Sequence, residues 1–485
     1  MEKSHGAGAP APIRLKVSAK NIPVTERIAR YVATLRFADL PVGVRETAKE
    51  HIFDGIATMI AGAREDASVH IRRYTTARGG KRESTILGTR VKAAARCAAL
   101  ANAVQGHVLD YDDTQLATSA KTPFGQLTHP TTPVLAAALA VAEKSSASGR
   151  DLLTAYIAGV EVACRLADAI DPGHYLGGFH PTGTIGVFGA AAASARLVSL
   201  DAARTKTALA LAATFSAGIR AHRGSMAKAL NAGRAAENGV VAAELARNGF
   251  TAAQNVFEAP MGFFSAASHN HVDDARLKFG HGSFFAAPGI AIKRYPCAGV
   301  LHPALDAAIE LALRHAIEAR AIKKITVTMG NTSAAPLVYD RPASGLEGKF
   351  SAPFSIAVAV LERAAGIRQY TDAKVAAPAV KALTRKVELR RDARLDSAGF
   401  EHARATLEIR LNDGRVYRAE SRPPKGHPKN PLSRRELEEK MRECAGRYLA
   451  ARSIGRIIDR VWSIETAPSI ATMMADFRNA FAGPR

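Results

Sequence analysis

The sequence predicts a mainly α-helical protein, in which a large all-α domain is followed by a smaller α+β domain. Three observations predict this fold class. Apolar residues recur at three-to-four spacing from about residue 23 to 267, short alternating segments replace them near residue 290, and a charged helix begins after Ser433. Alanine is abundant while aromatic residues make up only 6%, which is typical of closely packed helices.

The chain is long enough for two or three domains, because it has 485 residues and a domain averages about 150. Residues 1–22 carry Gly, Ala and Pro without an apolar stretch, so we expect a disordered tail and no signal peptide. We expect an all-α domain over 23–288, an α+β domain over 289–428, and C-terminal helices over 429–485 that return to the all-α domain.

Several helices are predicted in the N-terminal half. Val44, Ala48, Ile52, Ile56 and Ile60 have the spacing of one buried helix face. Ser148 caps a second helix from Gly149 to Ile170, which Pro172 ends. Two alanine-rich helices, Gly183 to Leu197 and Ala202 to Ala217, belong at the centre of a bundle, and Ser84 to Leu87 is a short strand.

Glycines at 183, 186 and 189 resemble a dinucleotide-binding fingerprint, but no strand precedes them. We therefore interpret them as helix-packing glycines and expect no cofactor.

The second half mixes strands and helices. Its expected strands are Lys324 to Met329, Lys386 to Arg390, Ala405 to Leu411 and Arg415 to Ser421, with a helix from Phe354 to Ala364. Asn412-Asp413-Gly414 makes a hairpin turn between the last two strands. We expect antiparallel strands, and a final helix in which Ser433 and Glu436 form a capping box.

The formal net charge of +22 does not by itself indicate nucleic-acid binding. Lysine and arginine are interleaved with acidic residues and lack stacking aromatics, so a field that attracts small polyanions explains the charge equally well. The alternative class is a non-catalytic basic binding protein, for nucleic acid or as a scaffold. It predicts strongly salt-dependent DNA binding and no pocket that joins the reactive residues described below.

The cysteines at 97, 164, 297 and 444 are far apart, which favours reduced thiols over a zinc site or a disulfide framework. No apolar run reaches membrane-spanning length. We expect a soluble cytoplasmic protein that binds neither membrane nor nucleic acid.

A segment from His107 to Thr114 crowds three carboxylates, a hydroxyl and an imidazole between two apolar helices, and Thr128-His129-Pro130 follows. Taken alone, such a run is a charged surface loop. Asp110, Thr114 and His129 are the candidates for proton chemistry, whereas we expect Asp112 and Asp113 only to cap or solvate the turn. We expect the spacer from Lys121 to Leu127 to be flexible.

Further reactive residues lie at turns marked by glycine or proline: His180 in 178–184, Lys228 in 226–236, and His302 after the Lys-Arg-Tyr-Pro of 293–296. Proline follows His129, His180 and His302, and we expect it to keep each histidine backbone extended. Each histidine alone is more typical of a hydrogen-bonded structural residue, but the set indicates a site.

Together these motifs and Lys349-Phe350-Ser351 resemble the MmgE/PrpD family from about residue 24 to 480. That family contains 2-methylcitrate dehydratases, cis-aconitate decarboxylases and an iminodisuccinate epimerase. The resemblance implies that the α+β domain is a lid inserted into the all-α domain, that the protein is a homodimer, and that no metal is used. It also implies catalytic roles for Asp110, Thr114, His129 and His180, and substrate binding by Lys228 and His302.

The chain departs from the family pattern in three places. Asn231 stands where many members have histidine, the gap between Thr114 and His129 is longer than in the decarboxylases, and a Trp-Gly-His-Pro motif of the typical methylcitrate dehydratases is absent. The gap argues against a decarboxylase, and the missing motif distinguishes the chain from the typical methylcitrate dehydratases.

The chemistry of all three family activities moves a proton beside a carboxylate, which requires a base and cations. We expect a metal-independent hydratase or dehydratase of a small 2-methylcitrate-like polycarboxylate. His129 would be the general acid/base and would be oriented by Asp110 and Thr114, whereas Lys228 and His302 would hold carboxylates. A decarboxylase or an epimerase is the alternative.

Overall fold

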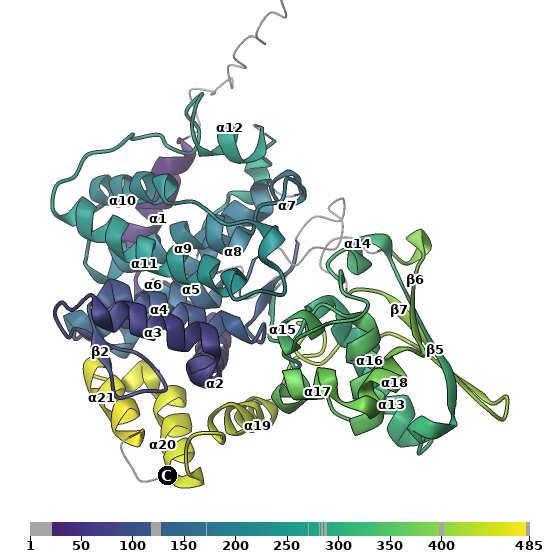
Figure 1. Cartoon of the computed structure of the whole chain (residues 1–485). Coiled ribbons are helices and arrows are strands. Elements are labelled where there is room, and N and C mark those ends of the chain that lie inside the picture. The colour runs from purple at the N-terminus through teal and green to yellow at the C-terminus, as the bar shows by residue number, and fades with distance from the viewer. Residues whose placement is uncertain are drawn as a thin grey trace, which may run out of the picture.

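The computed structural model describes residues 22–117, 128–170, 172–269, 271–280, 282, 285, 289–396 and 402–481. The expected tail up to residue 21 and the spacer from Lys121 to Leu127 lie outside these ranges. Within them the protein is mainly α, as predicted, with a helical body and a smaller α+β unit side by side (Figure 1). None of the helices in these ranges is long and apolar enough to cross a bilayer.

The helical body contains most of the helices. Its first helices are α1 (Val24–Thr34), α2 (Val42–Ala61), α3 (Asp66–Ala77), α4 (Ala95–Val108), α5 (Thr131–Ser145) and α6 (Gly149–Ile170). The following ones are α7 (Gly173–Leu176), α8 (Pro181–Thr184), α9 (Gly186–Leu197), α10 (Ala202–Thr214), α11 (Ala227–Arg247) and α12 (Phe263–Ser268). Helices α4, α5, α6, α9 and α11 pack against one another and form its centre.

Glycines explain how closely the central helices approach. A Cβ on Gly159 of α6 would lie 2.6 Å from the carbonyl oxygen of Gly189 of α9, and a Cβ on Gly189 would lie 2.7 Å from that of Gly159. Gly183 and Gly186 face equally close neighbours. Their interpretation as packing glycines is confirmed.

Two predicted helix boundaries need correction, whereas α6 matches its prediction. The segment from Gly183 to Leu197 is two helices, α8 and α9, which separate at Ile185 (φ −101°). Helix α10 ends at Thr214, not at Ala217, and the chain then passes through Gly218 (φ +139°) to residue 219, which forms a β-bridge with Phe179. The oxygen of Ser148 accepts a hydrogen bond from the backbone N–H of Asp151 (3.2 Å), as expected for a capping residue.

The α+β unit has its own apolar core. Its helices are α13 (His302–Arg314), α14 (Asn331–Ala334), α15 (Gly345–Gly348), α16 (Ala352–Glu362), α17 (Asp372–Ala376) and α18 (Pro378–Thr384). Its strands are β5 (Ile322–Met329), β6 (Val387–Arg391), β7 (Ala405–Leu411) and β8 (Val416–Glu420), in the order β6-β5-β7-β8. The helices cover the face of this sheet that is turned towards the helical body (Figure 1).

One pairing in this sheet differs from the expectation. Strands β5 and β6 are parallel, not antiparallel, because the chain between them passes through five helices and re-enters the sheet in the same direction. The pairs β5–β7 and β7–β8 are antiparallel, and the hairpin turn at residues 412–414 is confirmed.

Two short antiparallel ladders lie outside the main sheet. Strand β1 (Ser84–Thr85) pairs with β2 (Lys92–Ala93), and β3 (Thr114–Gln115) pairs with β4 (Ile290–Ala291). The second ladder joins the Asp-rich segment to the chain that enters the α+β unit.

The chain returns to the helical body after this unit. Helices α19 (Arg434–Ala445), α20 (Ala451–Trp462) and α21 (Ile470–Ala480), yellow in Figure 1, pack on α2 and α5 and share the apolar core of the body. Ser433 and Glu436 form the predicted capping box. The C-terminal segment therefore completes the helical body.

Candidate active site

The Asp-rich segment begins where α4 ends, and it is buried. Asp110, Asp112 and Asp113 are exposed by 3%, 0% and 1%. Asp110 has φ +51°, the left-handed conformation common just after a helix, and its N–H donates to the carbonyl of His107 (3.0 Å). A surface loop is therefore the wrong interpretation of this segment.

Asp112 and Asp113 do more than cap or solvate the turn. Asp112 Oδ2 accepts hydrogen bonds from Nδ1 of His107 (2.8 Å) and the hydroxyl of Thr132 (2.7 Å). Asp113 Oδ2 lies 2.7 Å from Nδ1 of His51 on α2. The expectation failed because α2, α4 and α5 enclose the segment, so each carboxylate requires a partner inside the protein.

Lys228 lies in the first turn of α11 and reaches the end of α4. Its Nζ is 2.6 Å from Asp110 Oδ1 and 3.1 Å from Nε2 of His107. Because an ammonium group can only donate, Nε2 of His107 accepts, and the ring proton is on Nδ1, facing Asp112. A continuous polar chain thus runs from Asp112 through His107 and Lys228 to Asp110.

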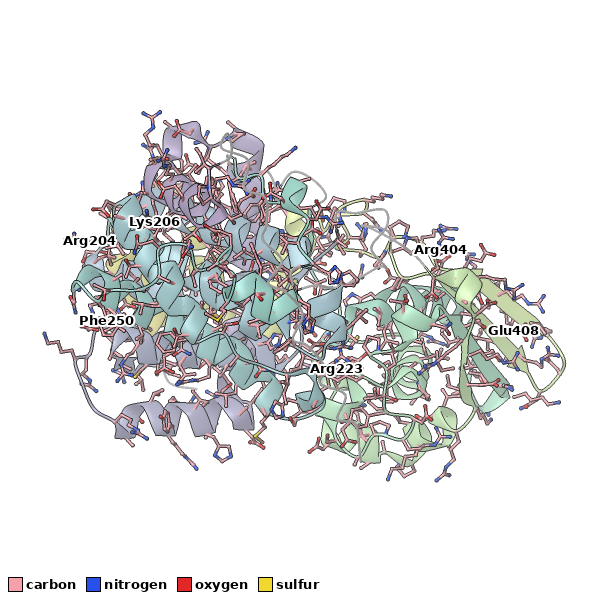
Figure 2. All side chains as sticks on the ribbon, turned by 90° about the horizontal axis from the view of Figure 1, so that it is seen from above. Arg204, Lys206, Arg223, Phe250, Arg404 and Glu408 are labelled. Carbon is pink, nitrogen blue, oxygen red and sulfur yellow. The ribbon has the colours of Figure 1, made fainter. Side chains whose placement is uncertain are left out.

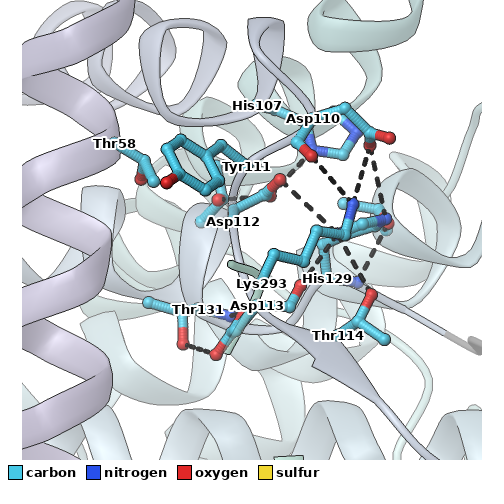
Figure 3. Close-up of polar contacts among 12 residues, drawn as sticks. Thr58, His107, Asp110, Tyr111, Asp112, Asp113, Thr114, His129, Thr131 and Lys293 are labelled. Atoms are coloured by element: carbon cyan, nitrogen blue, oxygen red, sulfur yellow. Dashed lines mark hydrogen bonds and ion pairs between the residues drawn. The ribbon is translucent and has the colours of Figure 1, made fainter. Parts of the chain in front are cut away.

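His129 presents one ring nitrogen without a proton. Its Nδ1 donates to the carbonyl of Asp113 (2.8 Å), and Asp112 Oδ1 lies 3.5 Å from the same nitrogen. Nε2 therefore has the lone pair of the neutral ring, and it lies 4.0 Å from Asp110 Oδ1. Figure 3 shows His129 between Asp110 and Thr114. This geometry suits a general acid/base.

His180 shows the opposite arrangement of protons. Its backbone is extended, as predicted, with φ −102° and ψ 98°. The side-chain Nδ2 of Asn231 donates to Nδ1 of His180 (3.0 Å) and also to the carbonyl of Ile219 (3.4 Å), so the ring proton is on Nε2. Asn231 therefore fixes the tautomer of His180.

Four of the six predicted residues line one pocket: Asp110, His129, His180 and Lys228. Its other wall comes from the α+β unit and includes Val300, Thr332, Pro336 and Phe350. The pocket therefore lies between the two parts of the molecule.

Three cationic side chains in this pocket were not predicted as site residues. Lys293 is 3% exposed, and its Nζ lies 3.1 Å from Asp110 Oδ1, close to His129 in Figure 3. Arg220 and Arg223 both contact Tyr175, and Figure 2 labels Arg223 where the helical body meets the α+β unit. Lys293 opens the Lys-Arg-Tyr-Pro motif, which was a sequence signal for it, whereas Arg220 and Arg223 lie in no distinctive motif.

Thr114 and His302 do not line this pocket but a neighbouring one, whose wall also includes Lys293. The hydroxyl of Thr114 lies 3.5 Å from Nδ1 of His129, so it contacts the ring at this nitrogen and not at Nε2. The predicted substrate contact of His302 stays a prediction.

The backbone prediction for His302 was wrong. His302 begins helix α13 with φ −55° and ψ −44°, because Pro303 is tolerated in a first helical turn.

Comparison with known proteins agrees with this arrangement. The MmgE/PrpD N-terminal domain matches residues 26–274, and the MmgE/PrpD C-terminal domain matches residues 295–464. The chain belongs to the MmgE/PrpD family.

Relatives within the MmgE/PrpD family are cis-aconitate decarboxylases. The chain is 26% identical over 466 residues to the Homo sapiens enzyme, which covers 93% of this chain and 94% of the relative. It is 27% identical over 470 residues to the Aspergillus terreus enzyme, covering 93% and 95%. These relatives identify the chain as similar to lyases, and they favour the decarboxylase alternative over the expected dehydratase.

The electrostatics of this MmgE/PrpD pocket keep its histidines neutral. Burial lowers the pKa of His107, His129 and His180, and the nearby cation Lys228 lowers each further. Burial alone would raise the pKa of Asp110, but Lys228 and Lys293 hold it well below its ordinary value. The pocket therefore presents neutral imidazoles among cations, a suitable environment for a polyanion.

A metal ion is a poor fit to this cluster. Among the described residues, His107, Asp112 and His129 have potential ligand atoms within 4.8 Å of one another. However, Asp112 Oδ2 already accepts two hydrogen bonds, and Lys228 donates to Nε2 of His107. A divalent cation would also lie beside two lysines. The donor set is better explained as a hydrogen-bonded network.

The buried histidines predict that the protein loses stability in mild acid. His107, His129, His180 and His302 all have lowered pKa values, that of His302 being about 3. The unfolded chain binds protons near pH 6.5 and the folded chain does not, so unfolding takes up protons. The free energy of unfolding should fall below pH 6.5 by about 1.4 kcal/mol per pH unit for each histidine.

Urea unfolding at pH 7.5, 6.5 and 5.5 measures this loss. Asp54 offsets about one histidine's contribution to this loss of stability. Burial raises the pKa of Asp54 to about 6, so its folded form binds a proton at a pH where the unfolded form does not. In a His302→Gln variant, the free energy of unfolding should fall less steeply with decreasing pH, by about the contribution of one histidine. Equal stability at pH 7.5 and 5.5 would contradict the neutral histidines.

Proposed function

We propose that this chain is a decarboxylase of a small unsaturated tricarboxylate of the cis-aconitate type. One observation carries the proposal: Nε2 of His129, free of a proton, lies in a pocket that, among the described residues, is lined by four cationic side chains and a single carboxylate. The named activity of the relatives supports the same substrate class.

The cations account for substrate binding. Lys228 and Lys293 are on the inner wall, and Arg220 and Arg223 are nearer to Tyr175. Several carboxylates can thus be held at once, and each charge-assisted hydrogen bond is stronger than a neutral one. Asp110 stays ionised between the lysines and keeps them directed into the pocket.

The proton step follows from the position of His129. A bound polyanion favours the imidazolium form, and Asp112 Oδ1 beside Nδ1 supports that charge. The carbon–carbon bond to an allylic carboxylate breaks and CO₂ leaves. Its electron pair forms a new double bond, while the far carbon of the former double bond takes the proton from Nε2. One proton is consumed in each turnover.

Neutral CO₂ requires no cation, and the opposite wall provides an apolar surface for it. Ala298, Val300, Pro336 and Phe350 line this side of the pocket. We infer that the leaving carboxylate faces these residues, since an apolar environment favours the neutral product over the charged carboxylate. We also propose that the α+β unit closes over the pocket as a lid, that the protein is a homodimer and that it is located in the cytoplasm.

Proton NMR in D₂O tests the reaction directly. The protein is incubated separately with cis-aconitate, 2-methylcitrate and iminodisuccinate. We expect cis-aconitate alone to be consumed, with CO₂ released and one deuterium in the dicarboxylate product. Reversible loss of water would restore the dehydratase, and deuterium entering an unchanged iminodisuccinate skeleton would indicate an epimerase. Turnover of none of the three would contradict the proposal.

Ligand binding itself should take up a proton. A saturated tricarboxylate such as tricarballylate cannot decarboxylate by this route, yet its charge raises the pKa of His129. Calorimetric titration at pH 7 in buffers of different ionisation enthalpy should therefore give an uptake of about one proton per ligand. The uptake should disappear in His129→Asn and persist in His70→Asn, a variant of an exposed histidine on α3. Uptake that survives in His129→Asn would place the proton elsewhere.

A further inference from the structure

Three lysines bind three successive backbone carbonyls just after α4. Nζ of Lys349 donates to the carbonyl of Leu109 (2.9 Å), Nζ of Lys293 to that of Asp110 (3.0 Å), and Nζ of Lys440 to that of Tyr111 (2.9 Å). All three lysines are buried, with exposures of 2%, 3% and 6%. They come from the α+β unit, the connecting chain and the C-terminal helix α19, respectively.

Two of these lysines also join the Asp-rich segment to the chain at 293–296. Lys349 donates to the carbonyl of Pro296 (2.9 Å) as well as to Leu109. Lys440 donates to the carbonyl of Lys293 (2.7 Å) as well as to Tyr111. Each ammonium group therefore bridges the two segments that carry Asp110 and Lys293.

The position of these cations is electrostatically favourable. The carbonyl of Leu109, the residue that caps α4, lies at the partially negative end of the helix dipole, which attracts cations. The carbonyls of Asp110 and Tyr111 follow directly and are buried, so they also require donors. Among the described residues, Lys349 forms no ion pair with a carboxylate, and burial lowers its pKa to about 8. Its hydrogen bonds go to the carbonyls of the two segments instead.

Asp110 requires such support. Aspartate adopts the left-handed conformation more readily than most residues but less readily than glycine, so contacts from the surroundings stabilise it. The conformation directs the carboxylate of Asp110 to Lys228, which in turn donates to His107. A shift of Asp110 would therefore move Lys228, which lines the pocket, and with it the hydrogen bond to His107.

We propose that Lys349 and Lys440 are positioning residues, which hold Asp110 in its left-handed conformation and so align Lys228 and His107 for the reaction. The inference rests on the proposed function for its kinetic consequence, whereas its structural consequence is independent of the substrate. The active pocket is then complete only when the α+β unit and α19 are both docked on the helical body.

The test compares Lys349→Met and the double variant Asp54→Asn/Lys440→Met with the wild-type protein. Asp54 is changed together with Lys440 because its Oδ1 lies 2.5 Å from Nζ of that lysine. We expect kcat to fall by about 10²-fold, the cost of a small misplacement in a site, while KM changes little. Crystal structures of the variants should show Asp110 outside the left-handed region.

Lys49→Met is the matched control. Lys49 is another buried lysine, at 9% exposure, but its Nζ pairs with the carboxylates of Glu46 (2.6 Å) and Glu465 (3.9 Å) instead of with backbone carbonyls after α4. It should keep the wild-type kcat and the left-handed Asp110, whatever its effect on thermal stability.

Three outcomes would overturn the inference. They are a wild-type kcat in both folded variants, an unchanged conformation of Asp110, or a rise in KM while kcat keeps its wild-type value. Failure of both variants to fold while Lys49→Met folds would also overturn it, because the lysines would then serve stability alone. If the wild-type protein does not act on cis-aconitate, the proposed function fails, and the conformation of Asp110 still decides the inference.

Discussion

Replacing Lys228 by methionine is expected to lower kcat/KM for cis-aconitate by roughly 10³-fold, the usual cost of removing one charged donor from a reacting centre. Lys228 is the cation that contacts both Asp110 (2.6 Å) and His107 (3.1 Å) in the pocket. Its loss removes a carboxylate-binding group and leaves Asp110 with Lys293 as its lysine partner. Methionine keeps the length and apolar part of the side chain, so the change tests the charge.

Steady-state kinetics with cis-aconitate measures this effect. Lys81→Met, at an exposed position, serves as the control and should keep full activity. The affinity for tricarballylate should also fall in Lys228→Met, because the lysine binds the ligand before any chemistry. A variant with normal affinity and normal kcat would show that Lys228 is structural.

Replacing His129 by asparagine is expected to lower kcat by about 10²- to 10⁴-fold, the range that a positioned proton donor contributes. Asparagine has a donor that can keep the hydrogen bond to the carbonyl of Asp113, but it has no titratable nitrogen in place of Nε2. The residual rate should therefore lose its dependence on the protonation of this group.

The pH profile of kcat distinguishes this role from a structural one. In the wild-type protein the profile should contain a limb from His129 in the substrate complex, and in His129→Asn this limb should be absent. His70→Asn should have the wild-type profile. Full turnover in His129→Asn together with loss of turnover in Lys228→Met would assign the proton to another group.

Local sequence patterns predicted those parts of the fold that local chemistry decides. Ser148 and Ser433 cap their helices because a short side-chain oxygen satisfies the N–H groups of the following turn. Strand β7 has its predicted limits, since alternation and an Asn-Asp-Gly turn specify a hairpin. The parallel pairing of β6 could not be predicted, because it depends on how a long connection crosses the sheet.

The candidate site was predictable only in part for the same reason. Asp110, His129, His180 and Lys228 lie in recognisable motifs and meet in one pocket. The burial of Asp112 and Asp113 depends on partners from other helices, which no local pattern reveals. Arg220 and Arg223 carry no distinctive motif, and the hydrogen bond from Asn231 to His180 depends on the tertiary contact between α8 and α11.

The three carbonyl-binding lysines are synthesised at different times, because they lie far apart in the chain. Lys440 on α19 follows the whole α+β unit in the chain, yet it binds a carbonyl next to Asp110, which is made far earlier. While a ribosome is still producing the α+β unit, Lys228 and Lys293 have already been made, but Lys440 has not, so the carbonyl of Tyr111 lacks this partner. A nascent helical body would therefore carry the reactive side chains before it can use them, and activity would begin only after α19 has been synthesised.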